Sequence, residues 1–298
     1  MSNPFSIPVK GECKVEDIMY WCYEREVIRL QKVQGVEAPW TTDTILSAYR
    51  FCNVDRRDDK VTQWLIDNVY SKYSDMEDLW LIAIICRLVN WPPTLQKLFE
   101  LYTPKYAEEF DAGYFASSLQ YIADNSEKVY GGAYVTYPGR EPGVKKSEFF
   151  AYKVLPSLVE RRELIRDAIN RNFVELSVLE MSSGFGVSTF MSGQAISDLT
   201  YVEGQLDKAE DLHTYAPQGP GSISGMNRLF DRAKGASWSK KDFNSNLIDV
   251  RNHLVSELGF DKLSLHSVQN VFCEVDKYWR VLNEEGRPRT KYTPETSF

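Results

Sequence analysis

Apolar residues recur along most of this chain at the three- and four-residue spacing typical of amphipathic helices. From Val15 to Val33 this spacing predicts a helix with Ile18 and Ile28 on its apolar side. We place Arg25 among the charged residues of the other side. Gly35 follows the last apolar position, and glycine commonly ends a helix.

Similar patterns continue to the end of the chain. Thr42 is a plausible N-cap for the second helix, whose apolar positions are Ile45, Leu46, Tyr49 and Cys52. The run that starts at Met76 is apolar on most sides, so we expect a central helix that Pro92-Pro93 stops. Other helices are predicted over 61–65, 95–101, 107–123, 149–179, 187–199, 239–258 and 265–282.

The sequence therefore predicts a mainly α fold. Only the segment YGGAYVTYPG favours extended chain and turns, so we expect at most a short β-hairpin near 130–137. We expect one compact all-helical domain over 1–298, with possible lobes at about 1–125 and 126–285 and a polar tail at 283–298.

Composition excludes several functional classes. The chain has 298 residues, a net charge of −7 and no apolar run long enough to span a membrane, so we expect a cytoplasmic protein. The five cysteines form no CxxC pair and the three histidines lack metal-ligand spacing, so we expect neither a metal nor a cofactor. A P-loop motif, GxxxxGK[ST], is absent.

Two glycine-rich turns each precede a helical segment. They are Gly184-Phe185-Gly186 and Gly219-Pro220-Gly221-Ser222. Backbone N–H groups at such a junction suit a phosphate, although an ordinary connection between helices has the same composition. The sequence leaves both interpretations open.

Two polar segments are candidates for contact with anions. The segment 50–60 contains Arg50, Asn53, Arg56 and Lys60 between apolar helices, and it is either a solvated connection or part of a site. The loop 139–147 contains Arg140, Lys145 and Lys146 near several tyrosines. Basic and aromatic side chains together can hold a nucleic-acid strand, but an exposed surface loop is an equal alternative.

Carboxylates close to these segments could act as general bases. Gln194 and Asp198 are four residues apart and share a helix face. Asp198 could equally serve as a local hydrogen-bonding residue. Asp211, in the loop before the second glycine turn, is a second candidate, and the sequence does not rank the two.

Several segments together resemble the phage alpha-glutamyl/putrescinyl thymine pyrophosphorylases, or amino acid:DNA transferases, and the helical domain of 5-hydroxymethyluracil DNA kinases. The similar segments, in the order of that family, are WCYEREVIRLQK, PWTTDTILSAYRFCNVDRRDDKVTQWL, GFGVSTFMSGQAISDL, GPGSISGMNRL and VQNVFCEVDKYWR followed by GRPRTKY.

The resemblance implies a helical fold like that of helix-hairpin-helix DNA glycosylases, with a flipped base. It also implies a reaction in which an amine replaces the pyrophosphate of 5-pyrophosphoryloxymethyl-deoxyuridine. The implied partners are double-stranded phage DNA and a small amine, in the host cytoplasm. Excision of a modified base and non-catalytic DNA binding are the alternatives.

The resemblance assigns roles to the candidate residues. Pyrophosphate or DNA-backbone binding is assigned to Arg50, Asn53, Arg56, Lys60, Lys277 and Arg280. Orientation or deprotonation of the amine is assigned to Gln194, Asp198, Asp211 and Glu274. DNA binding is assigned to Gly184, Gly186, Gly219, Gly221, Ser222, Arg140, Lys145 and Lys146.

Overall fold

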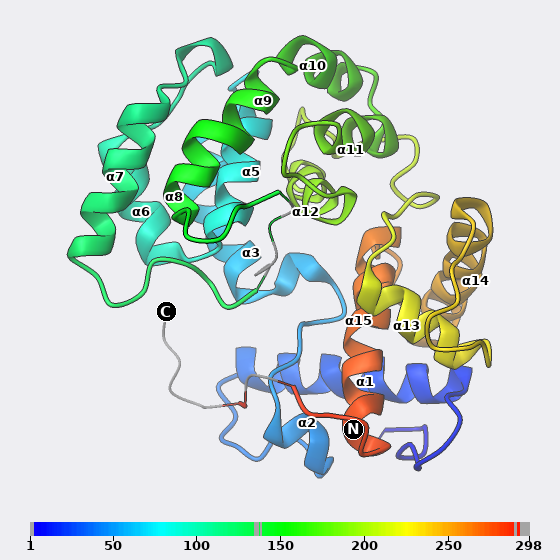
Figure 1. Ribbon diagram of the computed structural model, residues 1–298. Helices are drawn as coiled ribbons and strands as arrows, with labels where there is room; N and C mark the ends of the chain where they lie inside the picture. The colour runs from blue at the N-terminus through cyan, green and yellow to red at the C-terminus, as the bar shows by residue number, and fades with distance from the viewer. Residues whose placement is uncertain (1–2, 134–136, 138, 289–290, 293–298) are drawn as a thin grey trace. The chain divides into compact units, whose positions relative to one another are not determined.

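The computed structural model describes residues 3–133, 137, 139–288 and 291–292, and most of them are helical (Figure 1). The chain divides into two compact units. Unit 1 combines the described residues up to 59 with those from 213 onward, and unit 2 contains residues 60–212. This division differs from lobes that follow chain order, because the last helix of the chain packs against the first.

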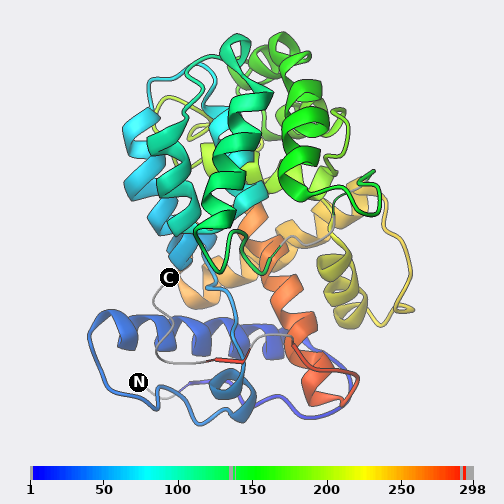
Figure 2. The ribbon, with the colours of Figure 1, turned by 60° about the vertical axis from the view of Figure 1, so that its left-hand side comes forward.

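Unit 1 is organised around its last helix, which contacts four of the other helices of the unit. This helix crosses the first one in both ribbon views (Figures 1 and 2). The elements of unit 1 are α1 (Val15–Val33), α2 (Thr44–Ala48), η1 (Arg56–Asp58), α13 (Pro220–Leu229), α14 (Lys240–Leu258) and α15 (Leu265–Leu282). The predicted bounds of the first and last helices are thus confirmed.

The core of unit 1 forms where α1, α13 and α15 meet. Trp21 and Cys22 of α1 are fully buried with Phe272 and Trp279 of α15. α13 can lie close to α15 because a Cβ atom on Gly225 would be only 2.2 Å from the carbonyl oxygen of Phe272. A side chain at position 225 would therefore push these helices apart.

The second helix is shorter than the pattern predicts. The prediction of Thr42 as the N-cap is wrong, because the cap is Asp43, whose carboxylate accepts the backbone N–H groups of Ile45 and Leu46 at 2.8 and 2.9 Å. α2 ends at Ala48, since Tyr49 adopts an extended conformation. The other carboxylate oxygen of Asp43 accepts the hydroxyl of Tyr278 at 2.7 Å, which ties α2 to α15.

Unit 2 packs its helices around α5, all of whose residues are buried, so the prediction of a central helix is confirmed. α5 contacts α12 and α6. The elements of unit 2 are α3 (Lys60–Leu65), the π-helical turn η2 (Ile66–Tyr70), α4 (Ser71–Tyr73), α5 (Leu79–Val89), α6 (Pro92–Leu101), η3 (Ala107–Glu109), α7 (Ala112–Asp124), α8 (Lys146–Phe149), the π-helical turn η4 (Phe150–Val154), α9 (Leu155–Val159), α10 (Arg162–Asn170), α11 (Val174–Ser182) and α12 (Thr189–Leu199).

The end of α5 differs from the prediction. Asn90 adopts the left-handed conformation with φ of 48° and ends the helix, because asparagine tolerates this conformation. Pro92 and Pro93 instead begin α6. The N–H groups of the first turn have no partner within a helix, so a proline there, which lacks this group, costs no hydrogen bond. The prolines therefore mark a helix start.

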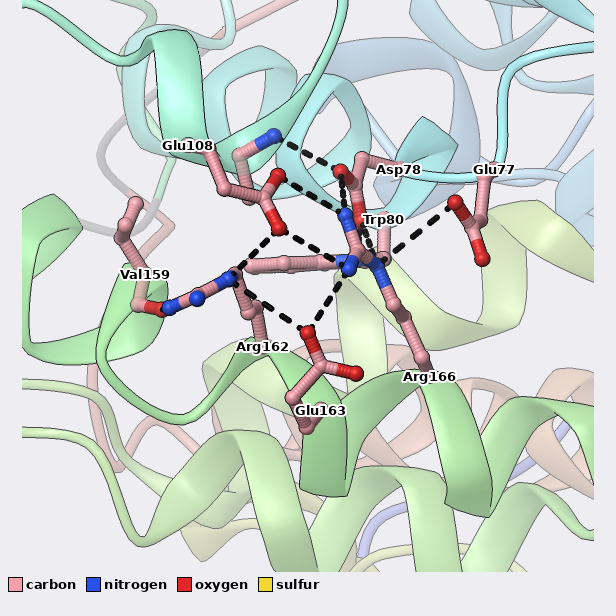
Figure 3. Close-up of polar contacts among 9 residues, drawn as sticks. Glu77, Asp78, Trp80, Glu108, Val159, Arg162, Glu163 and Arg166 are labelled. Carbon is pink, nitrogen blue, oxygen red and sulfur yellow. Dashed lines mark hydrogen bonds and ion pairs between the residues drawn. The ribbon is translucent and has the colours of Figure 1, made fainter.

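An ion-pair network joins the start of α5 to α10 (Figure 3). Arg166 donates to both carboxylate oxygens of the fully buried Asp78 at 2.9 and 2.6 Å. Asp78 also accepts the Trp80 indole N–H at 2.7 Å. Glu108 accepts from Arg166 and from Arg162. The hydrogen bond from Arg166 is the largest cause that lowers the pKa of Glu108 to about 2, so this network keeps its charges at neutral pH.

Residues 134–136 of the predicted hairpin region lie outside the described residues, and the neighbouring segment 130–133 forms bends without a strand. In the described part of the chain, no helix is both long and apolar enough to cross a lipid bilayer.

Candidate functional site

A cluster of charged and polar side chains in unit 1 brings together several residues that the sequence singles out. It lies between the segment 50–59 and α15, against α1. Glu274 and Lys277 come from α15, whereas Asn53 and Arg56 come from the segment 50–59. We call this group the α15 cluster.

Glu274 is the central carboxylate of the α15 cluster. Its side chain is 7% exposed, and Oε2 accepts the ammonium of Lys277 at 2.6 Å and the backbone N–H of Cys52 at 2.9 Å. Burial is the largest single influence and acts to lower the pKa of Lys277, but the Glu274 carboxylate and the neighbouring thiols together outweigh it, so the pKa lies above its ordinary value. Lys277 is therefore a cation at neutral pH.

Arg25 supports the segment 50–59 from α1. The guanidinium donates to the carbonyl of Cys52 at 3.1 Å and to Oδ1 of Asn53 at 2.9 Å. The backbone N–H of Asn53 in turn donates to Asp59 at 2.7 Å. Burial raises the pKa of Asp59 to about 6, since its partial loss of hydration outweighs the attraction of Arg56. The segment 50–59 is thus held by the buried Arg25 and by the hydrogen bond between Asn53 and Asp59 within the segment.

Arg56 lies beneath this surface and is only 5% exposed. Its Nη1 lies 2.9 Å from Nε2 of His266, and its backbone N–H donates to Ser267 at 3.3 Å. Because a guanidinium only donates, His266 accepts through an unprotonated Nε2. Arg56 therefore contributes positive charge from within the cluster rather than from its surface.

Two thiols border the cluster but are unsuited to nucleophilic attack. Burial raises the pKa of Cys273 to about 12 and that of Cys52 well above its ordinary value. Among the nearby charges, that of Glu274 also raises both pKa values, whereas those of Lys277 and Arg56 lower them. Protonated thiols leave the carboxylate as the basic group of the cluster.

The second glycine turn begins α13, beside the cluster. Gly219 is the N-cap, and its N–H donates to the hydroxyl of Ser222 at 3.1 Å. Ser222 is fully buried and also accepts from Gln269 of α15 at 2.8 Å. A Cβ atom on Gly221 would lie 3.2 Å from the sulfur of Cys273. These three residues serve packing between α13 and α15, and Ser222 has no surface with which to meet DNA.

Arg50, Arg280 and Lys60 lie outside the cluster in different ways. Arg50 is exposed, and its carbonyl accepts from Lys277 at 3.4 Å. Arg280 pairs with Asp276 at 3.1 Å, one turn earlier on α15. Lys60 begins α3 and belongs to unit 2.

Asp198 lies in the interior of unit 2. It is 1% exposed, and its carboxylate accepts two N–H groups of Arg87 and the hydroxyl of Tyr70, the latter at 2.6 Å. Three donors of this kind hold the carboxylate as a structural ion pair between α12 and α5. Gln194, on the same helix face, is buried as well, at 2% exposure.

Asp211 caps a helix of unit 2. Its two carboxylate oxygens accept the backbone N–H groups of Val174 and Glu175 at 2.7 and 2.8 Å. These are first-turn N–H groups of α11, which have no partner within the helix. Asp211 therefore accepts the N–H groups that begin α11, and this capping role accounts for its low exposure of 8%.

The first glycine turn and the basic loop lie side by side in unit 2. The turn connects α11 to α12, and Gly186 adopts φ of 74°. Phe185 is 51% exposed, and its ring contacts the ring of Phe149 at 6.2 Å between centroids. A Cβ atom on Gly139 would lie 2.8 Å from the same Phe185 ring, so the loop starts against the turn.

The basic side chains of this loop are held loosely. Arg140 and Lys145 are exposed, and Lys145 donates to Gln120 at 3.0 Å. The ammonium of Lys146 lies 5.0 Å from the centroids of the Tyr130 and Tyr137 rings. The structure thus brings Gly184, Gly186 and the three basic residues into one neighbourhood, which we call the GFG surface.

Two open cavities lie outside these groups. One, of about 340 Å³, is in unit 2 beside Arg166 and Lys208. The other, of about 280 Å³, is in unit 1 and includes Asp55, Asp58 and Asp261 in its wall. None of the residues that the sequence singles out lines either cavity.

Three residues that support the α15 cluster are not among those the sequence singles out. The sequence prediction puts Arg25 on the polar side of α1, although it lies three residues after Cys22 and three before Ile28, so the helical spacing itself puts it on the apolar side. Asp59 and His266 carry no local signal, because their partners come from distant parts of the chain or from the fold of the loop.

Comparison with known proteins places the chain in a family. The family described as "5-hmdU DNA kinase, helical domain" matches residues 13–287. A 5-hmdU DNA kinase of Bacillus phage SP10 is 26% identical over 281 residues, which are 86% of this chain and 43% of that relative. The chain thus spans less than half the length of this curated relative. No solved structure matches it. Since the match extends over most of the chain, the chain belongs to the family of the 5-hmdU DNA kinase helical domain.

Proposed function

We propose that this protein modifies thymine-derived bases in phage DNA by exchanging the pyrophosphate of 5-pyrophosphoryloxymethyl-deoxyuridine for an amine. Support for the substrate class comes from the family, because its name refers to a kinase that acts on 5-hydroxymethyl-deoxyuridine in DNA. The observation that carries the reaction class is the pairing of Glu274 with Lys277 beside Arg56, because it combines a basic carboxylate with cations.

The proposed step is a substitution at the exocyclic methylene carbon of the base. The amine nitrogen forms a bond to this carbon, and the bond from the carbon to the pyrophosphate oxygen breaks. Pyrophosphate leaves with the electron pair, and the amine loses one proton. Cations stabilise the charge of the leaving group, and a carboxylate can take the proton.

The α15 cluster supplies groups for both tasks. We assign the leaving group to Lys277 of the cluster and to the exposed Arg50 next to it, whose carbonyl accepts from Lys277, with Arg56 and Asn53 behind Lys277. Glu274 takes the proton of the amine. Of the three candidate carboxylates this choice leaves Glu274, because Asp198 is occupied by Arg87 and Tyr70, and Asp211 by the start of α11.

We further propose that the GFG surface holds the DNA backbone. A helix, a turn with two glycines and a second helix follow one another in α11 and α12, as in a helix-hairpin-helix motif. Arg140, Lys145 and Lys146 beside the turn supply positive charge for phosphates. This proposal includes a fold similar to that of helix-hairpin-helix glycosylases and a target base that is flipped out of the duplex.

Mass spectrometry of DNA tests the reaction. Duplex DNA that contains the pyrophosphorylated base is incubated with the protein and one amine at a time (glycine, glutamate or putrescine), and then digested to nucleosides. We expect a new nucleoside with the mass of one amine adduct and an equal amount of released pyrophosphate. No adduct and no pyrophosphate with any of the three would contradict the transferase. Abasic sites in the same DNA would indicate a glycosylase instead.

A second candidate function is that of a non-catalytic DNA-binding module. The comparison favours it, since the matching family is one domain of a longer kinase. This candidate requires salt-sensitive DNA binding and no turnover with any amine. The same mass-spectrometric experiment separates it from the transferase, provided that binding is measured in parallel.

A further inference from the structure

Two aromatic rings and a lysine form a compact surface in unit 1. The ammonium of Lys32 lies 4.5 Å from the centroid of the Trp40 ring and 4.3 Å from that of the Tyr292 ring. The rings meet edge to face, with centroids 5.9 Å apart and planes at 83°. Both aromatic side chains are half-buried and Lys32 is exposed. We call these three residues the aromatic platform.

Hydrogen bonds other than the ring contacts hold both aromatic residues of the platform in place. The N–H of Tyr292 donates to the carbonyl of Ala48 at 3.0 Å, and Lys291 forms an antiparallel bridge with Tyr49. The indole N–H of Trp40 donates to the carbonyl of Val36 at 2.7 Å. The rings are therefore fixed before any ligand binds, which limits the entropy lost on binding.

Positive charge gathers at the platform, and neither Lys32 nor Arg50 forms an ion pair with any of the residues that the structure describes. Arg50, two residues after Ala48, is exposed, and its guanidinium has no hydrogen-bond or ion-pair partner within the described residues. Although the Lys32 side chain as a whole is exposed, its ammonium loses hydration beside the two rings; this loss, with the like charges of Arg25 and Arg50, lowers the pKa of Lys32 to about 8. Like charges kept close together disfavour one another, so an anion at this place would relieve the repulsion.

Aromatic faces beside cations are a combination that suits a nucleic-acid strand. The rings offer stacking surfaces to bases, and the cations offer contacts to phosphates. A paired base keeps its faces stacked within the duplex, so only an unpaired base can reach the rings. An inorganic anion would use the cations but would gain nothing from Trp40 and Tyr292.

We propose that the aromatic platform binds an unpaired stretch of DNA strand, with a base stacked on the ring of Tyr292 and edge-on to that of Trp40, and with phosphates on Arg50 and Lys32. The proposal rests on the proposed function only in taking DNA as the substrate. The platform is continuous with the α15 cluster, because Lys277 donates to the carbonyl of Arg50. A strand held there would lead its next nucleotide toward Glu274.

Binding measurements with two variants test the platform. A fluorescein-labelled single strand of unmodified thymine-containing DNA is titrated with the full-length protein at several salt concentrations. We expect Tyr292→Ala to weaken binding about tenfold with an unchanged salt dependence, because it removes a stacking face and leaves the backbone contacts in place. Arg50→Gln is expected to reduce the slope of log Kd against log salt by about 0.7, the loss of one phosphate contact.

Controls and a second readout make the result decisive. Lys241→Gln, an exposed lysine on α14 without a contact to the platform, is expected to bind like the parent protein. Ultraviolet cross-linking with 5-iododeoxyuridine in the strand is expected to modify the peptide that contains Trp40 or Tyr292. The proposal is overturned if the parent protein does not bind the single strand, if both variants bind like the parent, or if a duplex shows the same sensitivity to Tyr292→Ala. Unmodified DNA needs no transfer step, so amine transfer can fail or succeed independently of this result.

Discussion

The ammonium of Lys277 lies 2.6 Å from Oε2 of Glu274, one turn earlier on the same helix, and that oxygen also accepts the backbone N–H of Cys52. This relationship couples the base of the α15 cluster to a cation and to the segment 50–59. A proton that moves to Glu274 weakens its hold on Lys277, which then becomes more available to a phosphate. The protonation of Glu274 and the contact of Lys277 with the leaving group thus change together during the proposed reaction.

Replacing Glu274 by glutamine tests this coupling. The amide oxygen can still accept from Cys52, so the fold is expected to remain, but glutamine cannot take a proton. We expect kcat for amine transfer to fall about 100-fold or more, with a smaller change in KM for DNA. Glu257→Gln, on the exposed side of α14, is the matched control and is expected to keep full activity. Unchanged transfer by Glu274→Gln would remove Glu274 from the role of base.

Asp198 is expected to behave as a structural residue. Asp198→Asn leaves the buried guanidinium of Arg87 without its counter-charge, which costs about 3–5 kcal/mol. Urea denaturation measures this loss. Asp167→Asn, which removes an exposed pair with Arg171, is the control and is expected to cost less than about 1 kcal/mol. An Asp198→Asn protein that is as stable as the parent but inactive in transfer would restore Asp198 as a candidate base.

The sequence predicts the helices well because their signals are local. Apolar spacing alone gives the bounds of α1 and α15, and it identifies α5 as buried. Local signals fail where another interaction decides the conformation. Asn90 ends α5 before the prolines do so, and the extended conformation of Tyr49 shortens α2.

The candidate site is less predictable, because charged residues look alike in a sequence wherever they lie. Asp198 and Glu274 are both acidic residues on helices beside apolar positions. Only the fold shows that Arg87 occupies the first and that Lys277 and Cys52 meet the second. The aromatic platform joins Lys32 and Trp40 to Tyr292 of a distant segment, so no sequence spacing could indicate it.

The GFG surface is expected to contribute salt-dependent affinity for DNA. Arg140→Gln and Lys145→Gln each remove one exposed cation and are expected to reduce the slope of log Kd against log salt for a duplex by about 1. Lys105→Gln, another exposed lysine of unit 2, is the control. The double variant is expected to show about twice the single change. Slopes equal to that of the parent would show that the loop does not contact DNA.

Asp59 makes the stability of unit 1 depend on pH. Its pKa is raised to about 6 in the folded protein, mainly by burial, so the folded state binds a proton more readily than the unfolded state. Stability from this group is therefore fully present below the ordinary pKa of an aspartate, near 4, and is lost as pH rises through about 6.

The variant Asp59→Asn tests this pH dependence, because it removes the ionisation and keeps an oxygen for the N–H of Asn53. We expect this variant to be more stable than the parent at pH 7.5 by about 1–3 kcal/mol and equally stable at pH 4. Urea denaturation at the two pH values measures the difference, with Asp249→Asn on the exposed side of α14 as the control. A variant that loses stability at pH 7.5 would show that the Asp59 carboxylate, held by Arg56 and Arg25, stabilises the segment 50–59 in its charged form.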